Sequence, residues 1–491
     1  MVARMAGTFP TLRITRDDFV PEGSFAETQA TYLRPDPTIV AELDRLLTEK
    51  KIGVVAHYYM DPELQGVLAA CDWPHVGVSD SLVMAARGIE MAKAGCRTIV
   101  VLGVDFMSEN ARAMLDAAGF EGTPVYRVAA DPIGCSLAES AEAQAYGAYL
   151  MEAKEHPNPL HVVYINTSLA TKAKAHALVP TITCTSSNVV QTILQAASQI
   201  DGVNVFFGPD TYMGHNLQAM FEALAKMDDE AIRAIHPDHD RETIRGLLER
   251  YHYFREGTCI VHHMFGEEVV ERVREEYADA FVTAHLEVPG EMFALGLEKQ
   301  RHGDGVVGST SNILAFITEK VEAAAEAGEE GTLRFVLGTE AGMITPIVRE
   351  VQRILNAHDA KCDAEIVFPV ASEAVAETAD PSLPIVPGVQ GGEGCSTAGG
   401  CATCPYMKMN TLDALLDLCR RVEVAPGADL APFEPKKYVE RIDGQTAAEL
   451  GGEPILHMRH FQQNGALPEA LVEDVKARGS RASGPGARAE S

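Results

Sequence analysis

Residues 51–59, KIGVVAHYY, and residues 76–85, VGVSDSLVMA, form the first of three similar pairs of segments in this chain. In each pair a short β-branched run ends in polar residues, and about 22–24 residues later a second run ends in a serine that opens a helical stretch. The other pairs are HVVYINTS (161–168) with TITCTSSNVV (181–190), and AFVTAHLEV (280–288) with DGVVGSTSNIL (304–314). Open α/β sheets bind their ligands at the carboxyl ends of parallel strands. The repetition therefore predicts an α/β protein in which three related modules face one shared site.

A third apolar run completes each module. These runs are TIVVLGVDFM (98–107), NVFFGPDTYM (204–213) and RFVLGTEAGM (334–343). In each run a glycine is followed two residues later by an acid, and we expect these acids to hold the loops at the mouths of the modules rather than to act in catalysis: Asp105, Asp210 and Glu340. Alternating helical and strand patterns are typical of parallel βαβ units with right-handed crossovers.

Length and composition restrict the class of protein. A chain of 491 residues favours about three domains, and its 46% hydrophobic and 23% charged residues are ordinary for a globular protein. A net charge of −29 argues against a nucleic-acid or acidic-membrane partner, which needs clustered Lys and Arg. No run approaches the roughly 20 apolar residues of a membrane span. Because the first residues also lack the apolar core of a secretory signal, we expect a cytoplasmic location.

The pattern also predicts where the chain divides. We expect an N-terminal extension at residues 1–35, a first module at 36–134 completed by about 395–475, a second at 135–258 with a helical insert at about 217–256, a third at 259–394, and a disordered tail at 476–491. The extension is Pro- and charge-rich without a sustained period, and the tail is low in complexity.

A glycine-rich segment, GGEGCSTAGGCATCPYMKMN (391–410), contains Cys395, Cys401 and Cys404. A thiolate followed by proline is common at iron–sulfur clusters, but a lone C-x-x-C also fits a zinc half-site or a redox pair. No second C-x-x-C completes a four-thiolate zinc site. The candidate partners are Cys135 and Cys259, single cysteines at module junctions. Three thiolates on a four-iron cluster would leave one iron open as a Lewis acid, whereas a Cys401–Cys404 disulfide would compete with cluster binding.

Eleven segments, taken in order, resemble the quinolinate synthase family. They are AHYYMDPELQ, SDSLVMA, GVDFMSENA, YINTSLATKAKA, CTSSNVV, GPDTYMG, CIVHHMF, HLEVP, GSTSNIL, GTEAGM and CPYMKMN. The resemblance covers about residues 40–420 and implies three similar αβα, Rossmann-like modules with short parallel sheets around a pseudo-threefold axis. It implies a 4Fe-4S cluster with three cysteine ligands at the centre, and a C-terminal segment that folds back on the first module.

The resemblance also implies a reaction. The family condenses iminoaspartate (iminosuccinate) with dihydroxyacetone phosphate to quinolinate, with loss of phosphate and water, in the synthesis of NAD. Such an enzyme belongs to the transferase class. An aspartate-oxidising enzyme is a candidate partner, because it would supply the imine.

Site residues follow from the same motifs. The resemblance implies cluster ligation by Cys135, Cys259 and Cys404, and catalytic roles for Tyr59, His57 and Glu287. The substrate-binding residues that it implies are His57, Ser81, Tyr164, Ile165, Asn166, Ser186, His285, Leu286, Glu287, Ser309 and Thr310. The serines stand at predicted helix starts, where backbone N–H groups favour carboxylate or phosphate, although plain helix capping explains them as well.

Glu287 is the candidate general base, because enolisation and dehydration need a proton acceptor near the open iron. The histidines can donate hydrogen bonds to carboxylates or shuttle protons. The sequence departs from the family at Leu286, where relatives usually carry proline, and after Cys259, where His262 is followed by histidine instead of an acid. Two other functions compete with this interpretation: an aconitase-like hydro-lyase, and a non-enzymatic iron or redox sensor. The sensor does not need the polar strand ends.

Overall fold

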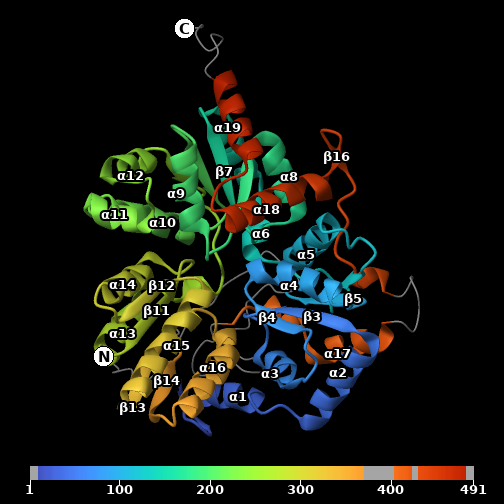
Figure 1. Ribbon diagram of the computed structural model, residues 1–491, viewed down its shortest axis with the longest axis vertical. Helices are drawn as coiled ribbons and strands as arrows, with labels where there is room; N and C mark the ends of the chain where they lie inside the picture. The colour runs from blue at the N-terminus through green and yellow to red at the C-terminus, as the bar shows by residue number, and fades with distance from the viewer. Residues whose placement is uncertain (1–8, 370–402, 423–429, 483–491) are drawn as a thin grey trace, which may run out of the picture. The chain divides into compact units, whose positions relative to one another are not determined.

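The computed structural model describes residues 9–369, 403–422 and 430–482 (Figure 1). The chain forms two compact units. Unit 1 comprises Met1–Gly103, Tyr126–Ile133 and Ile260–Glu434, and unit 2 comprises Val104–Val125, Gly134–Cys259 and Pro435–Ser491. None of the helices among the described residues combines the length and apolar character needed to cross a bilayer.

Three short sheets repeat one strand order. In unit 1 the first sheet is ordered β4-β3-β5-β6, and in unit 2 the sheet is ordered β8-β7-β9-β10. The second sheet of unit 1 begins β12-β11-β13-β14, which is the same order again. The bounds are β3 Ile52–His57, β4 Val76–Ser79, β5 Thr98–Leu102, β6 Val125–Tyr126, β7 Pro159–Tyr164, β8 Thr181–Cys184, β9 Asn204–Gly208, β10 Tyr251–Tyr253, β11 Phe281–His285, β12 Gly305–Gly308, β13 Glu330–Gly338 and β14 Lys361–Val367. This order confirms the repeated αβα modules.

The strands that carry the predicted polar ends are parallel to their neighbours. In each module the first strand pairs in parallel with the second and the third: β3 with β4 and β5, β7 with β8 and β9, and β11 with β12 and β13. Every residue of β3 and β7 is buried. Near-continuous apolar strands are expected when helices cover both faces of a parallel sheet.

Helices connect the strands. Those of unit 1 are α1 Ser24–Tyr32, α2 Pro37–Lys50, α3 Pro62–Ala70, α4 Ser81–Lys93, α13 Glu267–Glu276, α14 Gly290–Gln300, α15 Thr310–Ala327, α16 Ile344–Ala357 and α17 Leu412–Arg421. Those of unit 2 are α5 Asp105–Ala117, α6 Ser136–Glu142, α7 Gln144–Glu155, α8 Leu169–Leu178, α9 Val189–Gln199, α10 Thr211–Leu224, α11 Asp229–Ile235, α12 Arg241–Leu248, α18 Ala447–Asn464 and α19 Glu469–Ala482. Figure 1 shows β7 between α9 on one side and α8 on the other, and α15 beside α16.

From residue 9 on, the predicted N-terminal extension forms regular secondary structure, although its sequence has no sustained period. Strands β1 (Thr11–Ile14) and β2 (Phe19–Glu22) form a hairpin, and β1 pairs antiparallel with β14 at the edge of the third module's sheet. Leu12, Ile14 and Phe25 are buried in that module's core. Each strand has only four residues, too few for a period-2 pattern to be recognised, and the long-range pairing with β14 stabilises them.

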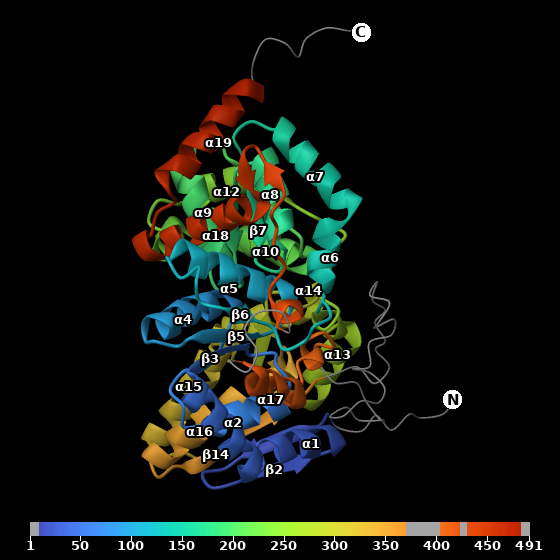
Figure 2. The same ribbon diagram turned by 90° about the vertical axis from the view of Figure 1, so that its right-hand side faces the viewer.

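Two other predicted segments also differ. The insert expected at about 217–256 ends in β10, which is the fourth strand of its sheet rather than an addition to it. The segment expected to complete the first module does so in part. Helix α17 packs on α2 and α18 packs on α5, both within the predicted bounds of that module, but α18 also packs on α8 and β8 of the second module. Figure 2 shows α18 close to α8. Helix α19 extends to Ala482, beyond the predicted start of the tail at residue 476.

A glycine sets how closely α18 approaches α8. A Cβ atom on Gly451 would lie 2.2 Å from the carbonyl oxygen of Leu169, whereas one on Gly452 would meet nothing closer than 3.9 Å. We expect Gly451→Ala to lower the free energy of unfolding by about 1–3 kcal/mol, because the two helices must separate. Gly452→Ala is the matched control and should leave stability unchanged or raise it by up to about 1 kcal/mol, because alanine favours helix. Denaturant unfolding measures both, and equal midpoints for the two variants would contradict this packing.

Candidate active site

Two strand-end histidines of unit 1 adopt the same local geometry. His57 ends β3, and its Nδ1 accepts a hydrogen bond from the backbone N–H of Tyr59 at 3.1 Å. His285 ends β11, and its Nδ1 accepts from the backbone N–H of Glu287 at 3.3 Å. Leu286, the residue in between, is buried. Leucine at position 286, where the family usually has proline, therefore still allows an ordered His-x-Glu turn. This turn matches the His-x-Tyr turn of the first module.

Both imidazoles are neutral at physiological pH. Burial lowers the pKa of His57 to about 4 and that of His285 to about 3, although the nearby Glu287 carboxylate raises both. Because Nδ1 accepts from a backbone N–H in each turn, the single proton of each neutral ring is on Nε2. The two modules thus each supply one N–H donor at a strand end.

A chain of hydrogen bonds joins Tyr59 to Glu287. The Tyr59 hydroxyl lies 2.9 Å from Oγ1 of Thr339, and this oxygen lies 3.4 Å from Nε2 of His262. On the other side of the ring, Nδ1 of His262 lies 3.0 Å from Oε2 of Glu287. With a proton on Nδ1 of His262, each donor in the chain can point toward the Glu287 carboxylate. Tyr59 and Glu287, two of the three residues predicted to be catalytic, are therefore coupled.

Gln65 and Gly342 fix the position of Tyr59. Nε2 of Gln65, on α3, lies 2.8 Å from each of the carbonyl oxygens of Tyr58, Met60 and Gly342, which share its two N–H groups. A Cβ atom on Gly342 would lie 2.6 Å from the Tyr58 carbonyl oxygen. Only glycine lets the third module approach the backbone that carries Tyr59 so closely.

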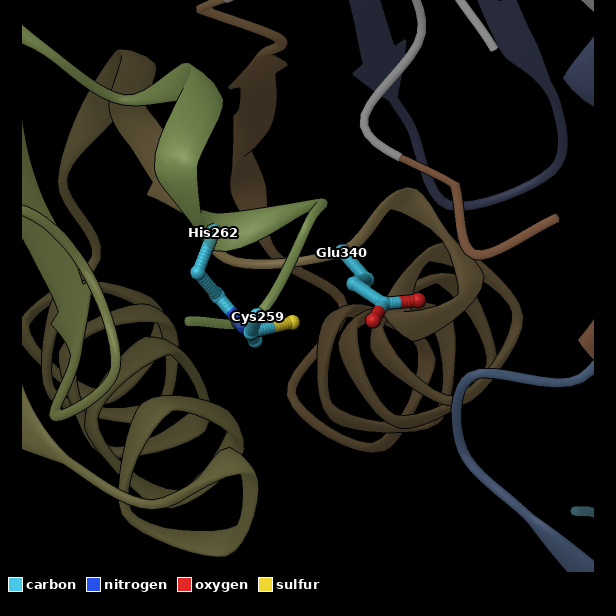
Figure 3. Close-up of side chains that lie close together, drawn as sticks. All are labelled: Cys259, His262 and Glu340. Carbon is cyan, nitrogen blue, oxygen red and sulfur yellow. The ribbon is translucent and has the colours of Figure 1, made fainter. Parts of the chain in front are cut away.

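A second buried carboxyl, Glu340, lies next to these groups. Burial, with the Glu287 charge nearby, raises the pKa of Glu340 well above its ordinary value, and its carboxyl accepts a hydrogen bond from the backbone N–H of Cys404. Cys259 is the last residue of the unit 2 segment Gly134–Cys259, and unit 1 resumes at Ile260. Its sulfur and the ligand atoms of His262 and Glu340 all lie within 4.8 Å of one another. Figure 3 shows Cys259 and His262 on one segment and Glu340 on another.

The serines of unit 1 occupy helix starts, as predicted. Ser309 is the N-cap of α15 and forms a capping box with Asn312, and Thr310 is the first residue of that helix. Ser81 is the first residue of α4, whose N-cap is Asp80. The Ser311 hydroxyl of the third module donates to Asp80 at 3.0 Å, which ties the two helix starts together.

In unit 2 the predicted residues follow β7 and β8. Tyr164 ends β7, and Ile165 and Asn166 follow it. The backbone N–H of Ile165 donates to the Cys184 carbonyl at the end of β8, and Ser186 lies two residues beyond. Ser186 does not cap a helix: it stands in a turn, and α9 begins only at Val189 after Asn188. Asn188 is the N-cap of α9 without a side-chain capping hydrogen bond, and its Oδ1 accepts instead from the backbone N–H of Thr185 at 2.8 Å.

The predicted cluster ligands are half-buried. Cys135 is the N-cap of α6, and Cys259 immediately precedes Ile260. The backbone N–H of Cys404 donates a hydrogen bond to the Glu340 carboxyl. Cys135 and Cys259 belong to unit 2 and Cys404 to unit 1, so that their convergence on one cluster stays a prediction. Cys395 and Cys401, and with them the proposed disulfide, lie outside the described residues. Burial raises the pKa of Cys71 and Cys419 to about 12, which is typical of inert core thiols.

Comparison with known proteins identifies the family. The family model described as "Quinolinate synthetase A protein" matches residues 41–426. The chain belongs to the quinolinate synthase family. It is 55% identical over 488 residues to a relative from Nicotiana tabacum (96% of this chain, 68% of the relative). A relative from Arabidopsis thaliana is 55% identical over 485 residues (95% and 67%), and one from Oryza sativa is 52% identical over 492 residues (95% and 69%). All three are named "Quinolinate synthase, chloroplastic".

Family membership confirms a quinolinate synthase of NAD biosynthesis and implies an iron–sulfur cofactor in general. The prediction of a cytoplasmic location is wrong, because the relatives carry a chloroplastic designation. The error has a physical cause. Organelle transit peptides are amphipathic and Arg- and Ser-rich, so that the lack of an apolar secretory core does not bear on them.

Sequence reasoning missed two residues and underrated a third. His262 was noticed only as part of a departure from the family, yet it is fully buried between Thr339 and Glu287. Glu340 was assigned to loop support, and it does bind the Cys404 backbone, but it also lies beside His262. Thr339 was not singled out. The usable signal was its place in GTEAGM, directly after the third strand of the third module.

Thr339→Val tests the hydrogen-bond chain, because valine keeps the shape of threonine and removes the hydroxyl that joins Tyr59 to His262. We expect turnover in quinolinate formation to fall by about 10–100-fold, a typical loss for an acid–base component. Thr345→Val is the matched control, because the Thr345 hydroxyl is buried in the same unit and has no hydrogen-bond partner within the described part of the chain. Steady-state kinetics on both variants decide the matter, and unchanged turnover in Thr339→Val would exclude the chain from catalysis.

Proposed function

We propose that this protein condenses iminoaspartate with dihydroxyacetone phosphate to form quinolinate, a transferase reaction that releases phosphate and water. The observation that carries the proposal is the buried chain from Tyr59 through Thr339 and His262 to Glu287, beside two neutral histidines. Family membership supports the same reaction.

A dicarboxylate substrate needs local hydrogen-bond donors, because the protein as a whole carries a net charge of −29. The Nε2–H groups of His57 and His285 are suited to this role. Being neutral, the rings donate without a buried positive charge, and their geometry is set by the backbone. The start of α15, at Ser309 and Thr310, adds the positive end of a helix dipole. In unit 2, Tyr164, Ile165, Asn166 and Ser186 are proposed to complete the binding groups.

Glu287 is the proposed general base. Condensation requires removal of a proton from a carbon next to a carbonyl, and dehydration requires a proton acceptor and a donor. The His262 N–H at 3.0 Å stabilises the Glu287 carboxylate without protonating it. Tyr59, at the other end of the chain, is the proposed proton donor to a leaving oxygen.

Cys135, Cys259 and Cys404 would hold the iron–sulfur cofactor. When bound, a 4Fe-4S cluster with three thiolate ligands supplies an iron with an open position that polarises oxygen substituents as a Lewis acid. The residues fit such a group. Oε2 of Glu340 is buried without a hydrogen-bond partner among the described residues, and the Glu340 carboxyl lies within 4.8 Å of the Cys259 sulfur. An inorganic group bound there would give this buried oxygen a partner. An aspartate-oxidising enzyme is the proposed source of the unstable imine.

The direct test is anaerobic reconstitution with iron and sulfide, followed by assay for quinolinate from enzymatically generated iminoaspartate and dihydroxyacetone phosphate. We expect quinolinate to form and to require both substrates. A fully reconstituted protein that forms none would sink the proposal.

Serine replacements test the ligand set. Cys135→Ser, Cys259→Ser and Cys404→Ser should each abolish the four-iron absorption spectrum, because each removes one of only three thiolates. Cys395→Ser is the control and should retain the spectrum and the activity. A full cluster in Cys404→Ser would move the third ligand to Cys401 or Cys395.

A further inference from the structure

A lysine is fully buried beneath the turn that follows β7 in unit 2. Lys172 lies on α8 with no exposed side-chain surface, and its ammonium donates to the carbonyl oxygens of Ile165, at 3.1 Å, and Thr167. These two carbonyls flank Asn166. Lysine is almost never fully buried unless it is paired, so that its presence calls for a reason.

The counter-charge is Glu109 on α5. Burial lowers the pKa of Lys172 to about 7, and electrostatic attraction from Glu109 opposes this shift. Burial also raises the pKa of Glu109. The Glu109 carboxylate also accepts from the backbone N–H of Leu169 at 3.0 Å and from the Tyr438 hydroxyl at 2.9 Å. Glu109 and Lys172 interact through their charges, and replacing two interacting buried charges with uncharged residues is often neutral or stabilising. Stability alone therefore does not explain the pair.

The first module has the same arrangement with a neutral residue. Gln65 is the fourth residue of α3 and donates to the carbonyls of residues 58 and 60, which flank Tyr59. Lys172 is the fourth residue of α8 and donates to the carbonyls of residues 165 and 167. Each donor stands eight positions after the last residue of the preceding strand, His57 or Tyr164. The repeat thus places a donor under each of two strand-end turns.

We propose that Lys172 is a positioning residue that fixes the turn at residues 165–167, so that Tyr164 and Asn166 hold the dicarboxylate substrate. It does for the second module what Gln65 does for Tyr59 in the first. The inference rests on the proposed function, because it assigns the strand-end groups of unit 2 to dicarboxylate binding. Lys172 acts through Tyr164 and Asn166 and is not itself assigned contact with the substrate.

Two double variants separate positioning from charge compensation. Glu109→Gln with Lys172→Gln replaces the pair by the residue that the first module uses, and Glu109→Gln with Lys172→Met removes the donor at similar side-chain length. Neither leaves an unpaired buried charge. Lys174→Met, at an exposed position on the same helix, is the matched control. The probe is quinolinate, whose dissociation constant is measured by calorimetry on anaerobically reconstituted protein, together with the KM for each substrate.

We expect the Gln/Gln variant and Lys174→Met to bind quinolinate within about threefold of the unmodified protein, and the Gln/Met variant to bind about tenfold or more weakly, because small misplacements of binding groups are costly. The KM for the dicarboxylate substrate should rise in parallel in the Gln/Met variant, with the KM for dihydroxyacetone phosphate unchanged. Equal quinolinate affinity in the Gln/Gln and Gln/Met variants would overturn the inference and leave the proposed function intact.

If the Gln/Met variant is insoluble, Lys172→Arg takes its place. Its planar guanidinium keeps the charge but cannot reproduce the compact ammonium, so that about tenfold weaker binding is expected again, and unchanged affinity would overturn the inference. An unmodified, reconstituted protein that makes no quinolinate overturns the proposed function and this inference with it.

Discussion

The buried carboxylate of Glu287 must be stabilised by a donor, and the His262 imidazole supplies one at 3.0 Å. Burying a carboxylate without a hydrogen-bond donor costs free energy, and the His262 ring offsets that cost. The hydrogen bond to His262 in turn fixes the orientation of that ring and presents its other nitrogen to Thr339. The base, its support and the link to Tyr59 therefore form one connected set within unit 1.

Backbone geometry, more than side-chain chemistry, organises this set. The His-x-Tyr and His-x-Glu turns fix the tautomers of His57 and His285, and Gln65 fixes the carbonyls on either side of Tyr59. Gly342 admits the third module to within contact of the first. The repeated βα unit explains this similarity. The same strand-to-helix turn places a polar group at the carboxyl end of a strand in each copy, and only the side chain differs between copies.

The repeated modules, the polar residues at the strand ends and the helix starts at Ser81 and Ser309 could be predicted from the sequence. These features depend on local periodicity and capping. The sequence did not predict that β1 and β2 would extend the third sheet, because the strands are short and depend on pairing with β14 more than 340 residues away in the chain. His262 and Thr339 were missed for a related reason. Thr339 stands between the glycine and the acid that follow each third strand, but the other two modules carry Val104 and Pro209 there, so the repeat does not mark a polar role. His262 has no counterpart in the repeat, and the role of both residues arises only when the first and third modules bring Tyr59 and Glu287 together.

The central claim is that neutral histidines at two strand ends receive a carboxylate of the substrate beside the Glu287 base. A crystal structure of the anaerobically reconstituted protein with quinolinate bound tests it most directly. The account predicts carboxylate oxygens of the ligand within hydrogen-bond distance of Nε2 of His57 and of His285, with Glu287 still bound to His262. Quinolinate held elsewhere, with both Nε2 atoms turned away from it, would contradict the account.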